Sequence, residues 1–246
     1  MPNWAFNNIT VKGKPHEILK FIEDTKVVSK EDTNNTNTYE IDGVTYEHSL
    51  NQLFPIPTEL TETTAGWFSS QEDGSKDPKQ VELEAKQEAN LAKYGAKDWY
   101  DWANINWDTK WGACDVRIDP NDYDETKDYY GFYCESAWSP PMGLLRKISE
   151  LYPNLVFGMS TTEESEAYAC FAVFYRGVMV AEKEIDPNPT DDSEEAKLWE
   201  QLADQDNDDE LWERQSEWRG EILFKLDEEM DECIDMVYTS LKMSYA

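Results

Sequence analysis

The amino-acid sequence predicts an α+β protein, and three patterns in the 246-residue chain support that prediction. Segments in which apolar and polar residues alternate, as in strands, occur between segments whose apolar residues have helical spacing. From residue 186 onward the chain becomes strongly acidic but keeps an apolar stripe of helical period. We therefore expect one α+β domain over residues 1–185 and an acidic helical extension over residues 186–246.

The N-terminal part begins with a strand and a helix. Residues 4–12 alternate well enough for a strand that ends at Gly13, and Pro15 opens a short helix. The apolar face of this helix consists of Ile18, Leu19, Phe21 and Ile22. The segments that follow are, in order, a polar loop over 27–37, a short strand near 44–46, an extended segment over 54–57, an exposed insertion near 69–80 and a helix over 81–94.

The second half of the domain is predicted to contain strands on both sides of one helix. Two strands, over 111–118 and 129–137, are joined by an acidic loop. Ser139 is a good N-cap for the next helix, which has prolines in its first turn and runs to about Leu151. A meander follows, with strands over 155–160, 167–175 and 178–184.

Tryptophan is concentrated between residues 99 and 111, where four of thirteen positions carry it. Large aromatic side chains usually pack in a core, so we interpret the cluster as structural, formed where the central helix meets the sheet. Its members are Trp4, Trp102, Trp107, Lys110, Trp111 and Trp138, with Lys110 as a cation–π or capping residue. The alternative is an aromatic platform that stacks bases or another ligand, with Lys110 as an anion site.

The charge balance excludes several classes of partner. With 52 acidic and 22 basic side chains the net charge is −30, which opposes direct binding to nucleic acid or to an anionic membrane.

Disorder is also excluded, because the chain has 10 Trp, 13 Tyr and 9 Phe. No stretch approaches the ~18 apolar residues of a membrane span, and no signal peptide is visible. We expect a protein of the cytoplasm of a bacterial host.

Catalytic and metal-binding signals are weak. The four cysteines form no CxxC pair and there are only two histidines, which argues against zinc. The loop from Asp119 to Asp124 has oxygen ligands at alternate positions but lacks the glycine and the closing glutamate of an EF-hand. No phosphate-binding glycine loop or nucleophile motif is present. We therefore predict a protein that is not an enzyme, with no cofactor and no metal site.

Several short motifs occur in a recognisable order: Met1-Pro2-Asn3-Trp4 with Asn7, Phe54-Pro55-Ile56-Pro57, Trp99-Tyr100-Asp101-Trp102, Asn106-Trp107-Asp108-Thr109-Lys110-Trp111 and Ala137-Trp138-Ser139-Pro140-Pro141. In order and spacing they resemble the YubB-type family of plasmid and phage proteins, over residues 1–185. One departure is Asp108, where the family pattern has Gly. The resemblance implies a ferredoxin-like fold, with a mixed or antiparallel sheet and helices on one face, and a mobile-element origin. It brings no established activity or catalytic residues.

The acidic extension has the pattern of one long helix. Residues 186–235 carry 20 acidic and 4 basic side chains, a net charge of −16. A helix over 208–242 is about 52 Å long at ~1.5 Å rise per residue, and Gly220 is a point where it could bend. Its apolar stripe, which the sheet or a second copy of the chain should cover, consists of Leu211, Trp218, Ile222, Leu226, Cys233 and Val237. The residues expected to contact a partner are Asp204, Asp206, Asp208, Asp209, Glu210, Glu213, Glu217, Phe224, Glu228, Asp231 and Asp235.

This charge exceeds what solubility requires, since a net charge of about 2–8 suffices for a small domain. The leading hypothesis is a non-enzymatic mobile-element protein that mimics nucleic acid. Its carboxylates would occupy a basic, nucleic-acid-binding surface of a host defence protein such as a nuclease or a CRISPR effector. Three alternatives stay open: a solvated helix face, a small-ligand or nucleotide-binding domain that uses the tryptophan-rich region, and a self-assembling protein that forms a homodimer through the C-terminal helix.

Overall fold

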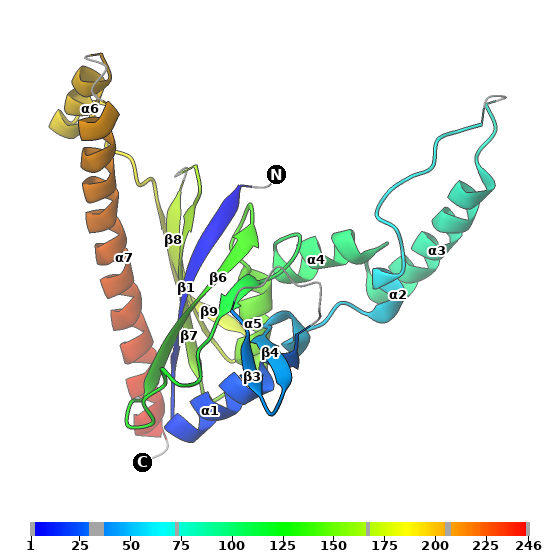
Figure 1. The fold of residues 1–246 in the computed structure, drawn as a ribbon, viewed down its shortest axis with the longest axis horizontal. Coiled ribbons are helices and arrows are strands. Elements are labelled where there is room, and N and C mark those ends of the chain that lie inside the picture. The colour runs from blue at the N-terminus through cyan, green and yellow to red at the C-terminus, as the bar shows by residue number, and fades with distance from the viewer. Residues whose placement is uncertain (1–2, 30–36, 72–73, 166–167, 205–207, 245–246) are drawn as a thin grey trace.

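The computed structural model describes residues 3–29, 37–71, 74–165, 168–204 and 208–244, with side chains as far as Leu241. Its centre is a six-stranded sheet in which all neighbouring strands are antiparallel, so the protein has the predicted α+β class (Figure 1). The strand order is β5–β6–β1–β7–β8–β9. The strands are β1 (Trp4–Lys12), β5 (Cys114–Arg117), β6 (Tyr129–Ala137), β7 (Val156–Glu163), β8 (Ala169–Tyr175) and β9 (Val178–Ile185).

β1 lies inside the sheet, paired with β6 on one side and with β7 on the other. Its side chains alternate between the two faces, as the period of a strand requires. Ile9 and Val11 are buried in the main core, whereas Lys12 faces the other side and forms an ion pair with Asp235. The alternation that predicted this strand therefore also decides which residues enter the core.

The main core lies between one face of the sheet and three helices, α1 (Pro15–Asp24), α4 (Trp99–Trp107) and α5 (Met142–Leu151). α1 follows β1 and precedes β5, and β6 lies between these two strands. α5 likewise joins β6 to β7, with β1 between them. Each helix thus belongs to a crossover between two strands that run in the same direction, and both helices cover the same face of the sheet.

A long insertion separates α1 from β5. It contains a second sheet in the order β2–β4–β3, followed by short helices and the helix α3. The bounds are β2 (Lys26–Val28), β3 (Tyr39–Ile41), β4 (Val44–His48), the 3₁₀ helix η1 (Asn51–Leu53), α2 (Thr58–Thr61) and α3 (Pro78–Tyr94). β2 begins a segment that the sequence predicts as a loop, and it forms because its backbone pairs with β4. α3 begins three residues before the predicted start, because the Asp77 side chain caps it by accepting from the Lys79 N–H.

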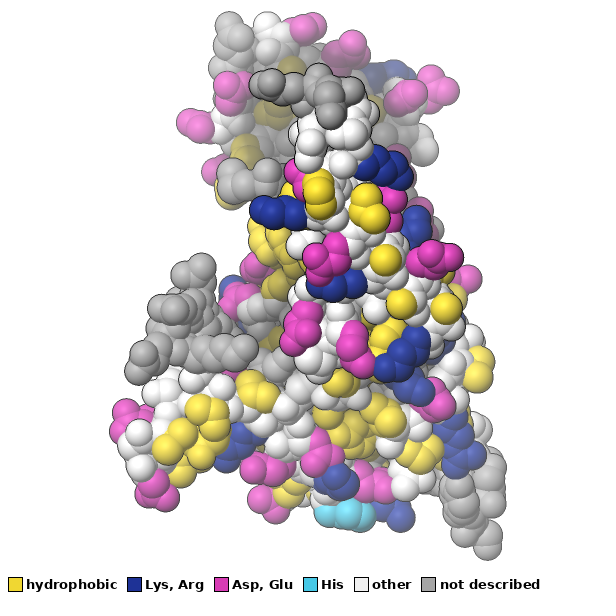
Figure 2. All heavy atoms as spheres, turned by 90° about the vertical axis from the view of Figure 1, so that its right-hand side faces the viewer, with side chains coloured by type: hydrophobic (Ala, Val, Ile, Leu, Met, Phe, Trp, Pro, Cys, Tyr) yellow, Lys and Arg dark blue, Asp and Glu magenta, His cyan; other side chains and the backbone are white. Residues whose placement is uncertain are grey.

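The helix α3 projects away from the main sheet, on the side opposite the C-terminal helix (Figure 1). Figure 2 views the molecule from this side, where basic and acidic side chains are interspersed. Ion pairs along the arm join Lys76 to Glu84, Lys86 to Glu82 and Lys93 to Glu59. The negative charge of the chain is therefore not concentrated on this arm.

The acidic extension forms two helices, α6 (Glu194–Asp204) and α7 (Asp208–Ser244). Helix α6 was not predicted from the sequence. The C-terminal half of α7 packs on the face of the main sheet opposite α1 and α5, in a second core that includes Leu226, Met230, Ile234 and Tyr238. The expectation of helices on one face is therefore incomplete, because the apolar stripe of α7 covers the other face. Among the described helices, none combines the length and the apolar character needed to cross a membrane.

Gly158 is the point of close approach between β7 and α7. A Cβ atom added at Gly158 would overlap the Ile234 side chain and lie 3.1 Å from the Met230 sulfur. We expect Gly158→Ala to destabilise the protein by about 1–3 kcal/mol, as other overpacking substitutions do. Denaturant unfolding measures the change. Gly220→Ala is the control, because nothing lies within 4 Å of its added Cβ.

The control should change stability in the opposite direction, since alanine in an exposed helix is favoured over glycine by roughly 0.5–1 kcal/mol. A Gly158→Ala protein as stable as the parent would show that α7 does not pack closely on β7.

Candidate protein-interaction site

The outward face of the acidic helices is a row of exposed side chains. Every described member of the predicted partner-binding set is exposed, and Asp206 lies outside the described residues. Asp204 ends α6, and the others follow on α7: Asp208, Asp209, Glu210, Glu213, Glu217, Phe224, Glu228, Asp231 and Asp235. The three acids in the first turn of α7 also stabilise its N-terminus through the helix dipole.

Phe224 lies in the middle of this row, with 64% of its surface exposed. At ~100° per residue, Glu217 and Asp235 lie within about 20° of Phe224 around the helix. A bend at Gly220 could have buried the ring, but α7 is a single helix through this position. The phase of the helix, read from the sequence, therefore placed Phe224 on the correct face.

Basic side chains neutralise only part of the acidic surface. Three ion pairs attach it to the rest of the chain: Arg214 to Glu195 of α6, at 2.9 and 3.0 Å, Lys183 of β9 to Glu229, at 2.7 and 2.6 Å, and Lys12 of β1 to Asp235. In the described part of the chain Glu213 and Glu228 have no ion-pair partner. These carboxylates are available to a cationic surface.

The surroundings of Asp231 raise its pKa above the ordinary value of an aspartate. Partial burial and then the nearby carboxylates of Asp227 and Asp235 raise its pKa, while Lys12 acts in the opposite direction. Acidification therefore protonates Asp231 at a higher pH than an isolated aspartate. This part of the surface loses negative charge early as the pH falls.

Trp212 belongs to the same helix, and its position on the surface was not predicted from the sequence. Its side chain is 70% exposed, more than that of Phe224. In helical phase it lies about 80° from Ile222, at the margin of the apolar stripe. The angle of about 80° between Trp212 and Ile222 could have indicated, from the sequence alone, that the Trp212 ring is exposed.

The tryptophan cluster divides into a buried part and an exposed part. Trp102 and Trp107 are buried, and Trp107 donates from Nε1 to the Phe54 carbonyl at 3.0 Å. Trp4 is half-buried, whereas Trp111 and Trp138 are 36% and 47% exposed. The expectation that the whole cluster is core is therefore wrong for Trp111 and Trp138. Both lie at the margin of the core and are partly exposed to solvent.

Lys110 occupies the exposed part of the cluster. Its ammonium lies 4.4 Å from the centre of the Trp111 ring, 5.4 Å from that of Trp138 and 5.9 Å from that of Tyr100. Trp111 and Trp138 are stacked, with ring centres 6.3 Å apart. The predicted cation–π role of Lys110 is confirmed.

The backbone at Trp138 has a conformation that is rare for a large side chain, with φ of 66°. Hydrogen bonds hold it on several sides. The Trp138 N–H donates to the Asn3 carbonyl at 2.8 Å, and the Tyr168 hydroxyl donates to the Trp138 carbonyl at 3.3 Å. On either side, the Thr109 hydroxyl donates to the Ala137 carbonyl and the Ser139 hydroxyl donates to the Asp108 carbonyl. These bonds fix the backbone of the turn that carries the half-exposed Trp138 indole.

Burial keeps three of the cysteines as thiols. Burial, and then negative charge nearby, raises the pKa of both Cys114 and Cys170 to about 11. Burial also raises the pKa of Cys134. Among the described residues, no group of three or more His, Cys, Asp or Glu side chains is arranged to hold a metal ion.

Comparison with known proteins identifies no family for this chain. No protein-family model matches the chain, and no curated protein matches it. Among solved structures it is similar to the crystal structure of protein api92 from Yersinia pseudotuberculosis, described by the family model DUF1281. The match has 10% sequence identity and a TM-score of 0.38, and it covers 77% of this chain and 100% of that chain. A likeness this distant carries no functional argument.

Proposed function

We propose that this chain is a non-enzymatic interaction protein whose α7 face occupies a basic, nucleic-acid-binding surface of a partner protein. The observation that carries the proposal is the exposed Phe224 ring within a row of carboxylates. A ring this exposed gains nothing from contact with water. Binding hot spots, in contrast, commonly place an aromatic anchor inside a polar rim.

The spacing of the carboxylates suits competition with a nucleic acid. Glu213 to Asp235 spans about 33 Å at ~1.5 Å per residue, a length over which one DNA strand carries on the order of ten phosphates. Asp209 and Glu210 in the first turn of α7, which lie about 60° and 40° from Phe224 in phase, extend the row. Carboxylates that replace phosphates attract a basic surface over long range and so increase the association rate. We propose nucleic-acid-binding proteins of a bacterial host, nucleases and CRISPR effectors among them, as the class of target.

Capture from a bacterial lysate on the immobilised chain tests this function. We expect basic nucleic-acid-binding proteins in the eluate, and we expect added duplex DNA to compete for the same proteins. If DNA does not compete, the α7 face does not occupy a nucleic-acid-binding surface.

Phe224→Ala is expected to weaken binding of a captured partner by about 1–2 kcal/mol and to leave the melting temperature almost unchanged. The reason is that the ring is exposed in the free protein and would become buried only in the complex. Isothermal titration calorimetry measures the affinity. Met236→Ala is the matched control, because Met236 is 65% exposed on the same helix but lies about 120° from Phe224 in phase.

A Phe224→Ala protein that melts several degrees early and binds normally would make Phe224 a structural residue. Equal losses of affinity in both variants would show a diffuse apolar contact rather than an anchor.

Affinity for the partner is expected to fall steeply as salt rises toward half-molar. Exposed charge pairs are screened beyond about 10 Å at 0.1 M ionic strength and at shorter range as salt increases. Association rates at several salt concentrations measure this, and charge reversal at Glu213 and Glu228 should reduce the slope. A complex whose stability does not depend on salt would have an apolar interface.

We also propose that the chain has the ferredoxin-like fold and the relation to YubB-type proteins that its motifs suggest. The strand order β7–β1–β6–β5, with α1 and α5 on one face, supports the fold. Asp108 supports the relation: it has φ of 62°, a conformation that favours the glycine of the family pattern and that aspartate tolerates.

A further inference from the structure

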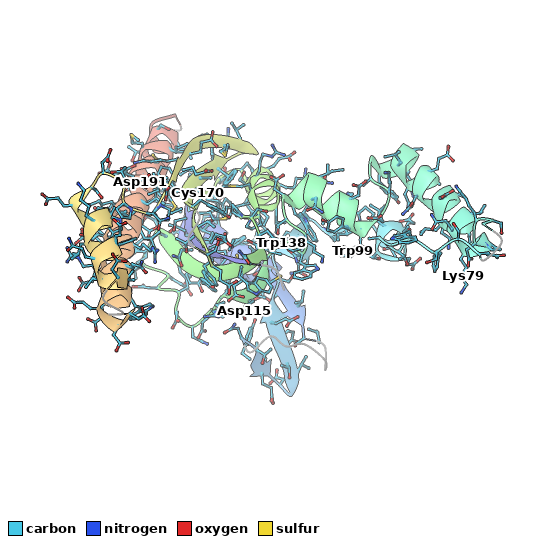
Figure 3. All side chains as sticks on the ribbon, turned by 90° about the horizontal axis from the view of Figure 1, so that it is seen from above. Lys79, Trp99, Asp115, Trp138, Cys170 and Asp191 are labelled. Atoms are coloured by element: carbon cyan, nitrogen blue, oxygen red, sulfur yellow. The ribbon has the colours of Figure 1, made fainter. Side chains whose placement is uncertain are left out.

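A separate cavity lies beside Trp138, where the turn between β6 and α5 meets β8 and β9. Its volume is about 530 Å³. The side chains that matter for its chemistry are Trp138, Tyr168, Glu182 and Glu184, with Pro140 and Met142 as apolar lining. Figure 3 labels Trp138 and Cys170, which both line this cavity, away from Lys79 on the α3 arm. A volume of this size is typical of a ligand pocket.

The charge in this cavity is negative. Glu182 and Glu184 are two residues apart on β9, so both point to the same face of the sheet. Lys183 between them also lines the cavity, but its ammonium is directed to the other face of the sheet, where it binds Glu229 of α7 at 2.7 and 2.6 Å. Within the described residues neither Glu182 nor Glu184 has an ion-pair partner. Burial raises the pKa values of Cys170 and Tyr168, and the charge of Glu184 adds to both, as the next cause for Cys170 and after Cys170 and Glu163 for Tyr168.

The aromatic wall of the cavity attracts cations. The Lys110 ammonium already lies over the Trp111 and Trp138 rings, so the electron-rich faces of this cluster accept a positive charge within the chain itself. Hydrogen bonds hold the Trp138 backbone beside the cavity, in spite of an unfavourable φ. Strain of this kind persists where the surrounding structure enforces it, and it is often found at binding sites.

A cation with a flat surface and several N–H donors matches both the tryptophan ring and the two carboxylates of the cavity. A guanidinium group stacks on a tryptophan ring and donates in pairs to carboxylates, whereas an ammonium group offers only a point charge. An anionic group would meet Glu182 and Glu184 without any unpaired basic side chain in the lining to compensate. We propose that this cavity binds an arginine side chain of a partner protein, stacked on Trp138 and bonded to the carboxylates of Glu182 and Glu184.

This site is distinct from the acidic face of α7. Glu182 and Glu184 point to the α5 side of the sheet, whereas Lys183 contacts α7 on the other side. The proposal therefore does not depend on the proposed function, and its test requires no partner protein. Experiment can therefore disprove the role of the α7 face or the cavity site without disproving the other.

Titration of the isotope-labelled full chain with a capped Gly-Arg-Gly peptide tests the proposal by NMR. We expect saturable shifts of the Trp138 indole N–H and of the β9 amides. Replacing arginine by citrulline, which keeps the shape and removes the charge, should weaken binding at least about tenfold, because hydrogen bonds to charged groups are the stronger class. The lysine peptide should bind less tightly than the arginine peptide.

Two variants connect binding to the named residues. The double variant Glu182→Gln, Glu184→Gln should also lose at least about tenfold in affinity. Both positions are exposed, so its melting temperature should stay near that of the parent. Trp138→Gly removes the aromatic wall, and glycine readily adopts the φ of 66° found there. The control pair is Glu150→Gln with Glu125→Gln, which are exposed and do not line the cavity.

Equal binding of the citrulline and arginine peptides would overturn the proposal, as would normal affinity in the Glu182, Glu184 double variant. If free arginine binds as tightly as the peptide, recognition of a partner's side chain is overturned in favour of a small-molecule site.

Discussion

Replacing Trp102 by alanine is expected to lower the free energy of unfolding by about 3–5 kcal/mol, the range for truncation of a buried large aromatic side chain. Trp102 is only 5% exposed and packs against Phe54 and Trp107, with ring centres 5.0 and 5.4 Å away. Its removal leaves a cavity between α4 and the segment that carries Phe54, and rigid neighbours fill such a space only in part. Denaturant unfolding at constant pH measures the loss.

Trp212→Ala is the matched control for this experiment. The same side chain is removed, but Trp212 is 70% exposed, and substitutions at such sites usually change stability by less than about 0.5 kcal/mol. Trp138→Ala should fall between the two, since its ring is half-exposed. If Trp102→Ala and Trp212→Ala unfold at the same denaturant concentration, the division of the tryptophans into core and surface is wrong.

The second large effect is a loss of stability in acid that depends on His48. This side chain is 2% exposed, and its Nδ1 lies 2.8 Å from the Thr25 hydroxyl. Because that hydroxyl donates to the Ile22 carbonyl, Nδ1 carries the hydrogen, and the buried Nε2 has no hydrogen-bond partner. Protonation would place a charge at Nε2 with no acceptor nearby.

Burial lowers the pKa of His48 from 6.5 to about 4, and the nearby Lys26 acts in the same direction, whereas Glu23 and Asp119 oppose it. The unfolded chain binds this proton near pH 6.5 and the folded chain only near pH 4, so the stability present above pH 6.5 is lost as the pH falls through that window. The full loss is about 3 kcal/mol, at ~1.4 kcal/mol per unit of pKa.

Chemical unfolding at a series of pH values, compared between the parent and His48→Gln, isolates this effect. The comparison is necessary because the chain has a net charge of −30, and protonation of its carboxylates also changes the self-repulsion of the folded state. His16, the other histidine, is exposed, so His16→Gln should keep the pH dependence of the parent. The same slope between pH 6.5 and 4 in all three proteins would contradict a buried, neutral His48.

Much of the local structure was predictable, because it depends on periods of two or 3.6 residues. The predicted ranges of β1 and β6 coincide with the observed strands, and the predicted start of α7 is correct. α6 was missed because its few apolar residues lie in a segment dominated by charge, and its packing partner, α7, follows later in the chain. The 26–28 strand was missed because it depends on a distant partner, β4.

For the candidate interaction site, the sequence by itself determined which residues share a face of α7. Helical phase orders Phe224, Glu217 and Asp235 along one side whatever the helix packs against. Tertiary structure decided what covers the opposite stripe: the chain's own β7 and β8, against which Leu226 and Ile234 are buried.

Tertiary structure also decided which tryptophans are buried and that a cavity lies beside Trp138. Residue type makes Trp102 and Trp138 equally suited to a core, but burial depends on what surrounds each ring, and that is set by contacts between segments far apart in the sequence.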